Sequence, residues 1–160
     1  MKKIFIYYSY TGNGDVVSKE LESKGYDIRK VISNYKISKN LFLAMMKGGF
    51  DSLRKKKPKL LNYDNNIEEY EEVVIGSPIW NSRFSPVVNT ILKETNLDNK
   101  KVTFILYSGG GEAKEASKYI KKNYPKAQII NLKEPKKYHD ELKKLGGLYE
   151  YRRNIKTSSR

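Results

Sequence analysis

The segment from Ile4 to Leu21 constrains the fold of this chain more than any other part of its sequence. An apolar run at residues 4–8 stops at the sequence SYTGNG (residues 9–14), and a helical pattern of apolar residues follows at once. A buried strand, a short loop of hydroxyls and glycines, and a helix are therefore expected in this order. Such a succession opens a βαβ unit, in which helices connect parallel strands.

The residues of this first loop suit a phosphate group. The first turn of a helix presents unpaired backbone N–H groups and the positive end of the helix dipole. Ser9 and Thr11 add hydroxyl groups, while Gly12 and Gly14 let the backbone approach an anion closely. The loop lacks the Lys of a Walker loop and the third glycine of a dinucleotide fingerprint. We therefore expect it to hold a terminal monoester phosphate.

Strands and helices alternate along the rest of the chain. Continuous apolar or β-branched runs, typical of strands that are buried on both faces, recur between helical patterns. This alternation predicts an α/β fold with an open, doubly wound parallel sheet and helices on both faces. The expected strands are residues 4–8, 26–32, 72–76, 102–107 and 127–132.

Three further helices follow from the capping residues and the apolar spacing. One begins at Ser85, whose hydroxyl is expected to cap it, with Pro86 in its first position. The next ends near Tyr124, and a short last helix, Asp140 to Leu145, is expected to break at Gly146. The side chains predicted to face inward from the first two are Val87, Val88, Ile91, Leu92, Ala113, Ala116 and Ile120.

Residues 39–61 lie between the second and third strands and are too apolar for a linker. The run Leu41–Met46 precedes the sequence KGGF (residues 47–50). We expect a helix that packs on the sheet and ends at the glycine pair. The alternative is an exposed Met/Phe patch that binds a partner.

Length and composition limit the possible classes. A chain of 160 residues fits one domain, here assigned to residues 1–147, with a basic tail at residues 148–160. The sequence has no cysteine, which excludes disulfides, Cys-ligated clusters and a thiol nucleophile. No segment resembles a signal peptide or is long enough to cross a membrane, so we expect a cytoplasmic protein. We expect no metal site.

The net charge of +14 is the most unusual global property of the sequence. Lys and Arg number 32 against 18 Asp and Glu, and much of the excess lies in short lysine clusters. A basic field attracts acidic proteins, anionic cofactors or nucleic acid. The alternative is a lysine-rich surface that only solvates the helices. For the tail we expect a frayed basic end, with contact to nucleic acid or an anionic membrane as the alternative.

Three segments that directly follow expected strands have unusual residue chemistry. They are residues 9–14, 77–84 and 108–111. In open parallel sheets, ligands bind beyond the carboxyl ends of the strands, so these segments should converge on one ligand. Trp80 offers the largest stacking surface in the chain, and the glycines of the third segment leave backbone groups accessible. A core tryptophan and a plain strand-to-helix turn are the alternatives.

With these segments, nearly the whole chain resembles the flavodoxin family, and specifically its short-chain type. The resemblance rests on Ser9–Asn13, on the sequence IGSPIW (residues 75–80) and on Ser108–Gly111. It implies the strand order 2-1-3-4-5 and a non-covalent FMN, with its phosphate in the first loop and its ring between the other two. The candidate cofactor-binding residues are Ser9, Tyr10, Thr11, Gly12, Asn13, Gly14, Ser77, Pro78, Ile79, Trp80, Asn81, Arg83, Ser108, Gly109, Gly110 and Gly111.

The chain departs from the family pattern at several points. Gly14 stands where the family usually has a threonine, which removes a phosphate hydroxyl worth about 1 kcal/mol. Asp15, in the first helical turn, would repel a phosphate if it turned inward. The basic charge is the reverse of the acidic surface of typical flavodoxins, so we expect acidic redox partners. Arg83 is predicted to approach the flavin and raise its reduction potential, with a solvated loop arginine as the alternative.

An electron-transfer protein is the leading functional prediction. No catalytic residue is predicted, since His139 is the sole histidine and lies far from the three segments in sequence. The alternatives are an FMN-dependent NAD(P)H oxidoreductase of the quinone-reductase kind and a flavodoxin-like scaffold that has lost FMN. A phosphorylated receiver domain is excluded because no acidic residue follows the first strand. We do not expect a nucleic-acid partner.

Overall fold

The computed structural model describes residues 1–36, 43, 46 and 56–149. Within this described part, five parallel strands form one sheet in the order β2-β1-β5-β7-β8. This order is the predicted 2-1-3-4-5, and the strands are β1 (Lys3–Tyr7), β2 (Asp27–Lys30), β5 (Glu72–Trp80), β7 (Lys101–Ser108) and β8 (Gln128–Lys133).

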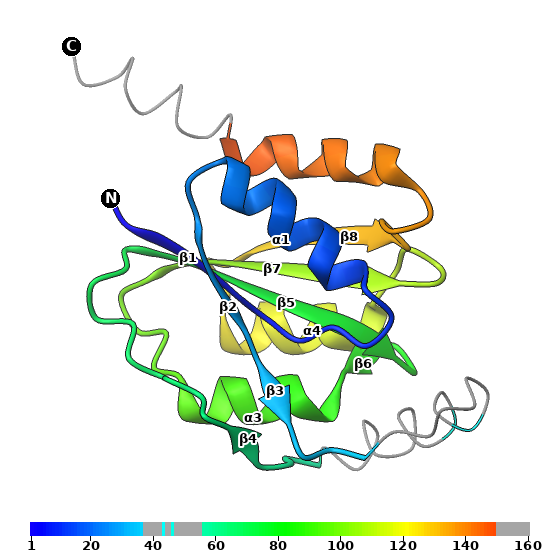
Figure 1. Cartoon of the computed structure of the whole chain (residues 1–160), viewed down its shortest axis with the longest axis horizontal. Helices are drawn as coiled ribbons and strands as arrows, with labels where there is room; N and C mark the ends of the chain where they lie inside the picture. Colours follow the sequence, from blue (N-terminus) through cyan, green and yellow to red (C-terminus); the bar gives the residue numbers. More distant parts are fainter. Residues whose placement is uncertain (37–42, 44–45, 47–55, 150–160) are drawn as a thin grey trace.

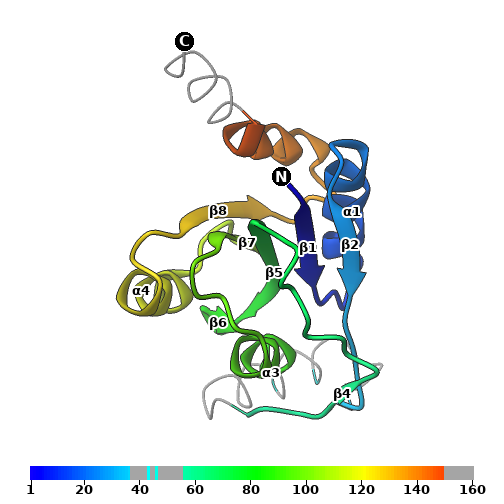
Figure 2. The ribbon, with the colours of Figure 1, turned by 90° about the vertical axis from the view of Figure 1, so that its left-hand side faces the viewer.

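Helices cover both faces of the sheet, as predicted. Figures 1 and 2 show α1 (Asn13–Ser23) and the 3₁₀ helix η1 (His139–Leu145) on one face, and α3 (Pro86–Glu94) and α4 (Lys114–Asn123) on the other. All four follow strands along the chain, so their N-termini lie toward the carboxyl edge of the sheet. At that edge the three segments, residues 9–14, 77–84 and 108–111, were expected to converge.

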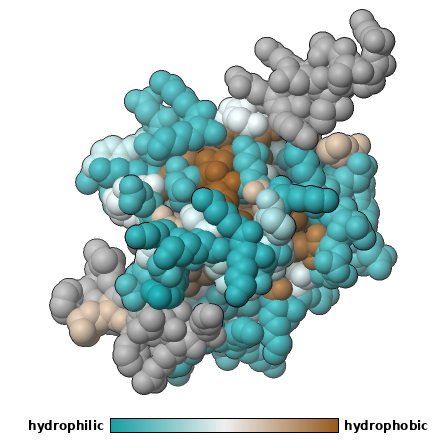
Figure 3. All heavy atoms as spheres, turned by 180° about the vertical axis from the view of Figure 1, so that it is seen from behind, coloured by the Kyte–Doolittle hydropathy of each residue, from teal (hydrophilic) through white to brown (hydrophobic). Residues whose placement is uncertain are grey.

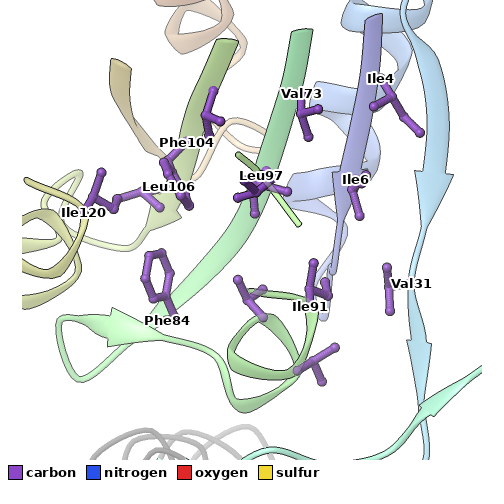
Figure 4. Close-up of a cluster of buried hydrophobic side chains, with 14 of the residues drawn as sticks. Ile4, Ile6, Val31, Val73, Phe84, Ile91, Leu97, Phe104, Leu106 and Ile120 are labelled. Carbon is purple, nitrogen blue, oxygen red and sulfur yellow. The ribbon is translucent and has the colours of Figure 1, made fainter. Parts of the chain in front are cut away.

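The sheet separates two hydrophobic clusters. Alternate residues of β1 face opposite sides, so Ile4 and Ile6 join the cluster under α3 and α4, while Phe5 and Tyr7 join the one under α1 and η1. Figure 4 shows the first cluster, where Phe84 and Ile91 lie opposite the strands. Burial on both sides explains why these strands read as continuous apolar runs.

β5 is longer than predicted. It runs through Trp80 and turns back into β6 (Arg83–Phe84), so residues 77–84 form a β-hairpin and not the expected loop. Asn81 and Ser82 form its two-residue turn, with φ values of 51° and 63°. Positive φ at both central residues matches the turn that best fits the twist of a hairpin.

The second expected strand also differs. It stops at Lys30, and the chain then forms β3 (Ile32–Ser33), which pairs antiparallel with β4 (Leu60–Leu61) in a separate sheet. The strand predicted at residues 26–32 is therefore divided between β2, in the main sheet, and the first residue of β3, in the second sheet. Val31, between them, is buried under the α3 side of the main sheet.

The capping prediction for α3 is half right. Pro86 stands in the first helical position, but the Ser85 hydroxyl makes no capping hydrogen bond. Ser85 is fully buried and its N–H donates to the carbonyl oxygen of Pro78 at 3.2 Å, so the residue closes the hairpin instead. Of the predicted inward side chains, only Leu92 is partly exposed, while Val87, Val88, Ile91, Ala113, Ala116 and Ile120 are buried.

The predicted helix break at Gly146 is wrong. The chain stays helical from η1 through residues 146–149, and Gly146 has φ −52° and ψ −34°. Leu145 and Leu148, three positions apart on one helical face, are both buried in the cluster under α1 and η1. Their burial outweighs the low helix propensity of two glycines. Leu148, assigned to the tail, thus belongs to the core, and residues 150–160 lie outside the described part.

The prediction for residues 39–61 falls mostly outside the described residues. Leu43 and Met46, which are described, are helical and 53% and 59% exposed. Helical packing or a partner patch in this segment therefore stays a prediction. Among the described residues, no helix has the length and apolar character needed to span a membrane.

Candidate functional site

The first loop leaves two helix N–H groups available for an anion. Gly12 precedes α1 with a φ of +95°, a conformation that favours glycine. The N–H of Gly14 donates to the Ser9 hydroxyl at 3.1 Å, and the N–H of Val16 donates to the carbonyl of Gly12 at 3.2 Å. Among the described residues, no acceptor is recorded for the N–H groups of Asn13 and Asp15. Together with the helix dipole they favour a bound anion.

Gly14 is required by its surroundings. A Cβ atom at this position would lie 2.6 Å from the hydroxyl oxygen of Tyr107, 2.7 Å from the ring of Tyr7 and 2.9 Å from Cβ of Ser9. The threonine of the family pattern therefore has no room here. Tyr107 comes from the end of β7, is buried, and donates its hydroxyl to the carbonyl oxygen of Tyr8. The hydroxyl of Tyr107 thus occupies the space of the missing side chain.

The charge of Asp15 is balanced at the start of α1. Its Oδ1 lies 2.7 Å from Nζ of Lys30 and accepts a hydrogen bond from the hydroxyl of Tyr7 at 2.7 Å. Partial burial acts to raise the pKa of Asp15, but the hydrogen bonds from Lys30 and Tyr7 bring it below its usual value. Burial raises the pKa of Tyr7 to about 12, so Tyr7 stays a donor at neutral pH. The repulsion between Asp15 and a phosphate is correspondingly weakened.

Four aromatic side chains gather beside the first loop. The ring of Trp80 lies 6.0 Å from that of Tyr10 and 6.4 Å from that of Tyr8, both nearly perpendicular to it. Tyr35, from the segment after β3, lies 6.3 Å away at an angle of 30°. Trp80 is partly exposed, at the end of β5. We call Trp80, Tyr8, Tyr10 and Tyr35 the aromatic cluster.

The cluster joins two of the three predicted segments. Tyr10 belongs to the first loop and Trp80 to the hairpin, so their contact brings these segments together as predicted. The third segment begins directly after Tyr107, whose hydroxyl donates to the carbonyl oxygen of Tyr8, the residue that precedes the first loop. Gly109 and Gly110 have open space around them, while Gly111 has a φ of +75° against Lys133. No contact of Ser108–Gly111 with the aromatic cluster is recorded among the described residues.

Several predicted residues serve the hairpin itself. The buried Ser77 hydroxyl donates to the carbonyl of Pro78 at 2.8 Å. Ile79 packs against the core cluster. Asn81 lies in the turn, where its carbonyl accepts a hydrogen bond from Nη1 of Arg83 at 3.1 Å. Arg83 pairs with Trp80 across the hairpin, and its side chain also lines a groove between α3 and α4.

Lys136 is a site residue that the sequence did not single out. Its Nζ donates to the carbonyl oxygen of Thr11 at 3.2 Å, and its N–H donates to Oδ1 of Asn13 at 3.0 Å. A pocket of about 310 Å³ lies here, lined by Thr11, Asn13, Glu134, Lys136 and Lys137. The clue in the sequence was position: Lys136 follows the last strand, at the same carboxyl edge as the first loop.

No group of three or more His, Cys, Asp or Glu side chains among the described residues could hold a metal ion. His139 begins η1, and no described contact joins it to the aromatic cluster. The chemistry at this edge is therefore that of an anion cradle, a lysine and an aromatic surface.

Comparison with known proteins identifies a family for this chain. A family model described as Flavodoxin (Flavodoxin_4) matches residues 2–145 of the chain. A search among curated proteins found no match.

Solved structures share the fold. A candidate flavoprotein of Bacteroides eggerthii is 22% identical with a TM-score of 0.68, and the match covers 83% of this chain and 91% of that chain. One from Bacteroides uniformis is 20% identical with a TM-score of 0.64, covering 80% and 88%. A flavoprotein of Lactobacillus acidophilus, in complex with FMN, is 19% identical with a TM-score of 0.62, covering 87% and 97%.

Proposed function

The chain belongs to the flavodoxin family (Flavodoxin_4), and on this premise we propose that it binds FMN non-covalently and carries electrons between redox proteins. The proposal is supported by three features at one edge of the sheet: the first loop at the start of α1, the aromatic cluster and Lys136. A similar fold in a flavoprotein complexed with FMN adds support. When bound, FMN supplies transfer of one or two electrons, a chemistry that no side chain here provides.

The first loop would hold the phosphate of FMN. The N–H groups of Asn13 and Asp15 and the dipole of α1 favour a dianion. The hydroxyls of Ser9 and Thr11 act as acceptors within the loop, from Gly14 N–H and from Nδ2 of Asn13, and each retains its own proton for donation. The loop therefore fits the phosphate even without a side chain at position 14.

The aromatic cluster would hold the isoalloxazine ring. A flat, electron-poor ring binds best by stacking on an aromatic face, and Trp80 is the largest in the chain. Tyr35, tilted by only 30° from Trp80, presents a second aromatic face close by. The backbone groups of Ser108–Gly111 would serve the polar edge of the ring.

The observation that carries the proposal is the contact of Tyr10 with Trp80 at 6.0 Å. It brings an aromatic stacking surface next to the loop in which no described residue accepts from the N–H groups of Asn13 and Asp15. A mononucleotide with a phosphate at one end and a flat ring at the other matches this pairing. A phosphate loop alone would fit many ligands.

The visible spectrum of the purified protein tests the proposal. Flavin absorption bands should be present, or should appear when FMN is added, and denaturation should release FMN and not FAD. A colourless protein that fails to take up FMN would identify a scaffold that has lost its cofactor. NAD(P)H oxidation by the holoprotein above the rate of free FMN would favour the oxidoreductase over the carrier.

A further inference from the structure

A second concave surface lies between α3 and α4, away from α1 and η1. It has a volume of about 610 Å³. Figure 2 shows β6 between these two helices, on the sheet face opposite to α1. We call it the α3–α4 groove, and its lining residues are Lys57, Arg83, Phe84, Asn89, Leu92, Lys93, Glu115, Ala116, Lys118, Tyr119 and Lys122.

The groove is strongly basic. Five cations line it, from the segment before β4 (Lys57), from β6 (Arg83), from α3 (Lys93) and from α4 (Lys118 and Lys122). The single carboxylate, Glu115, lies 3.2 Å from Nζ of Lys118. Among the described residues, no carboxylate lies within ion-pair distance of the other four. These four charges are therefore available to a ligand.

The floor of the groove is apolar. Phe84 is 5% exposed and Ala116 is 2% exposed, so both are covered mainly from below by the core. Tyr119 is 39% exposed and its ring meets that of Phe84 edge-on at 5.8 Å. Figure 3, which views the molecule from the side opposite to Figure 1, shows hydrophilic side chains over most of the face with hydrophobic surface between them.

The groove is connected to the aromatic cluster by the hairpin. Arg83, in the groove lining, pairs directly with Trp80 across β5 and β6. Ser82, in the turn, accepts the N–H of Glu115 on its hydroxyl at 3.1 Å and the N–H of Ala116 on its carbonyl at 2.9 Å. The turn thus fastens the start of α4 to the strand that ends at Trp80. A partner in the groove would contact the same hairpin that borders the proposed flavin site.

We propose that the α3–α4 groove is the docking site for an acidic segment of a partner protein, in which carboxylates flank one apolar side chain. Four cations that no carboxylate of the described residues pairs with, around an apolar floor, are complementary to such a segment. The apolar floor disfavours a run of nucleic-acid phosphates, which would gain nothing from contact with Phe84 or Leu92. If the chain carries electrons as proposed above, the partner is a redox protein. This is the only point at which the docking proposal rests on the proposed function.

A designed peptide tests the site directly. The probe is a short synthetic peptide with glutamates on both sides of a central phenylalanine, titrated into the full-length holoprotein by calorimetry. The variant Lys118→Glu/Lys122→Glu should weaken binding by about tenfold or more, because it reverses two charges of the groove. Lys114→Glu/Lys121→Glu makes the same change of net charge on the same helix outside the groove lining. At physiological salt, which screens long-range charge effects, this control variant should weaken peptide binding by less than about twofold.

Further arms separate the alternatives. Lys93→Glu on α3 tests the groove independently of α4, should the double variant fail to fold. Replacing the central phenylalanine of the peptide by alanine should weaken binding, while a single-stranded DNA oligonucleotide should not compete with it. Equal weakening by both double variants, or competition by DNA, would overturn the proposal. FMN absorption is recorded for every variant, so a loss of peptide binding with FMN still bound is distinct from failure of the cofactor proposal.

Discussion

The hydroxyl oxygen of Tyr107 lies 2.6 Å from the position that a Cβ atom on Gly14 would take. These residues are far apart in the sequence, one at the start of α1 and the other near the end of β7. The same hydroxyl donates to the carbonyl oxygen of Tyr8, so it joins β7 to the residue between β1 and the first loop. The family pattern places a threonine at position 14, and here a tyrosine from another strand takes its place in space.

Gly14→Ala should destabilise the protein and weaken FMN binding. The added methyl would clash with Tyr107, Tyr7 and Ser9 in a tightly packed site, at a cost of about 1–3 kcal/mol in the free energy of unfolding. Urea unfolding and FMN titration measure both effects. Gly146→Ala, with no atom within 4 Å of its added Cβ and with helical backbone angles, is the matched control. Equal stability of the two variants would show that Tyr107 leaves room at Gly14.

Trp80→Ala should weaken FMN binding by about 30-fold or more. The variant removes the main stacking surface of the aromatic cluster, which is worth about 2 kcal/mol or more through burial and ring contact. Trp80→Phe should recover part of the affinity because it keeps a smaller ring. The dissociation constant follows from FMN fluorescence. Unchanged affinity in Trp80→Ala would remove Trp80 from the ring site.

Lys136→Gln should weaken binding of FMN but not of riboflavin. Nζ of Lys136 lies against the first loop, 3.2 Å from the carbonyl of Thr11, where its charge would favour a phosphate. The expected loss is about fivefold, at the upper end of what an exposed charge contributes. Lys143→Gln, on η1 and paired with Asp140, is the control. Equal loss for both ligands would mean that Lys136 only supports the loop.

Arg83→Ala should lower the flavin reduction potential. A cation near the ring stabilises the added negative charge, and about 0.7 kcal/mol corresponds to about 15 mV for a two-electron couple. Arg83 pairs with Trp80 across the hairpin and is also one of the residues that line the α3–α4 groove. A redox titration of wild type and variant decides the matter, and an unchanged potential rejects the idea.

Folding stability should fall as the pH rises from about 10 to about 12. Burial raises the pKa of Tyr7 to about 12 from the usual 10.0, so the folded state favours the neutral form. The stabilisation is complete below the unfolded pKa and is lost as the pH passes through the folded one. Tyr7→Phe should flatten this decline in urea unfolding, whereas the exposed Tyr138→Phe should not. If the loss of stability with rising pH is the same in Tyr7→Phe, groups other than Tyr7 cause it.

Much of the fold follows from local patterns in the sequence. Apolar runs at Ile4–Tyr8 and Val102–Tyr107 predicted buried strands, and Pro86 predicted the start of α3, because burial on both faces and capping chemistry leave local signals. The strand order came with the family resemblance, since no spacing along a chain determines which strands lie side by side.

The missed features depend on contacts between distant residues or on tertiary packing. The third strand was expected to end at residue 76, yet β5 continues through Pro78, which has no N–H, into the hairpin. Lys136 meets Thr11 across 125 positions of sequence, and Tyr107 read as an ordinary core residue. The glycine pair at residues 146–147 is helical because Leu148 is buried beneath it. The sequence therefore predicted the edge of the sheet where the candidate site lies, but not all of the residues that gather there.

The most direct test of the central claim is a titration of the apoprotein with FMN while the emission of Trp80, the sole tryptophan, is recorded. The account predicts saturable uptake at micromolar concentration, with tryptophan emission quenched in step with the appearance of bound flavin. No uptake, or uptake that leaves the emission of Trp80 unchanged, would contradict it.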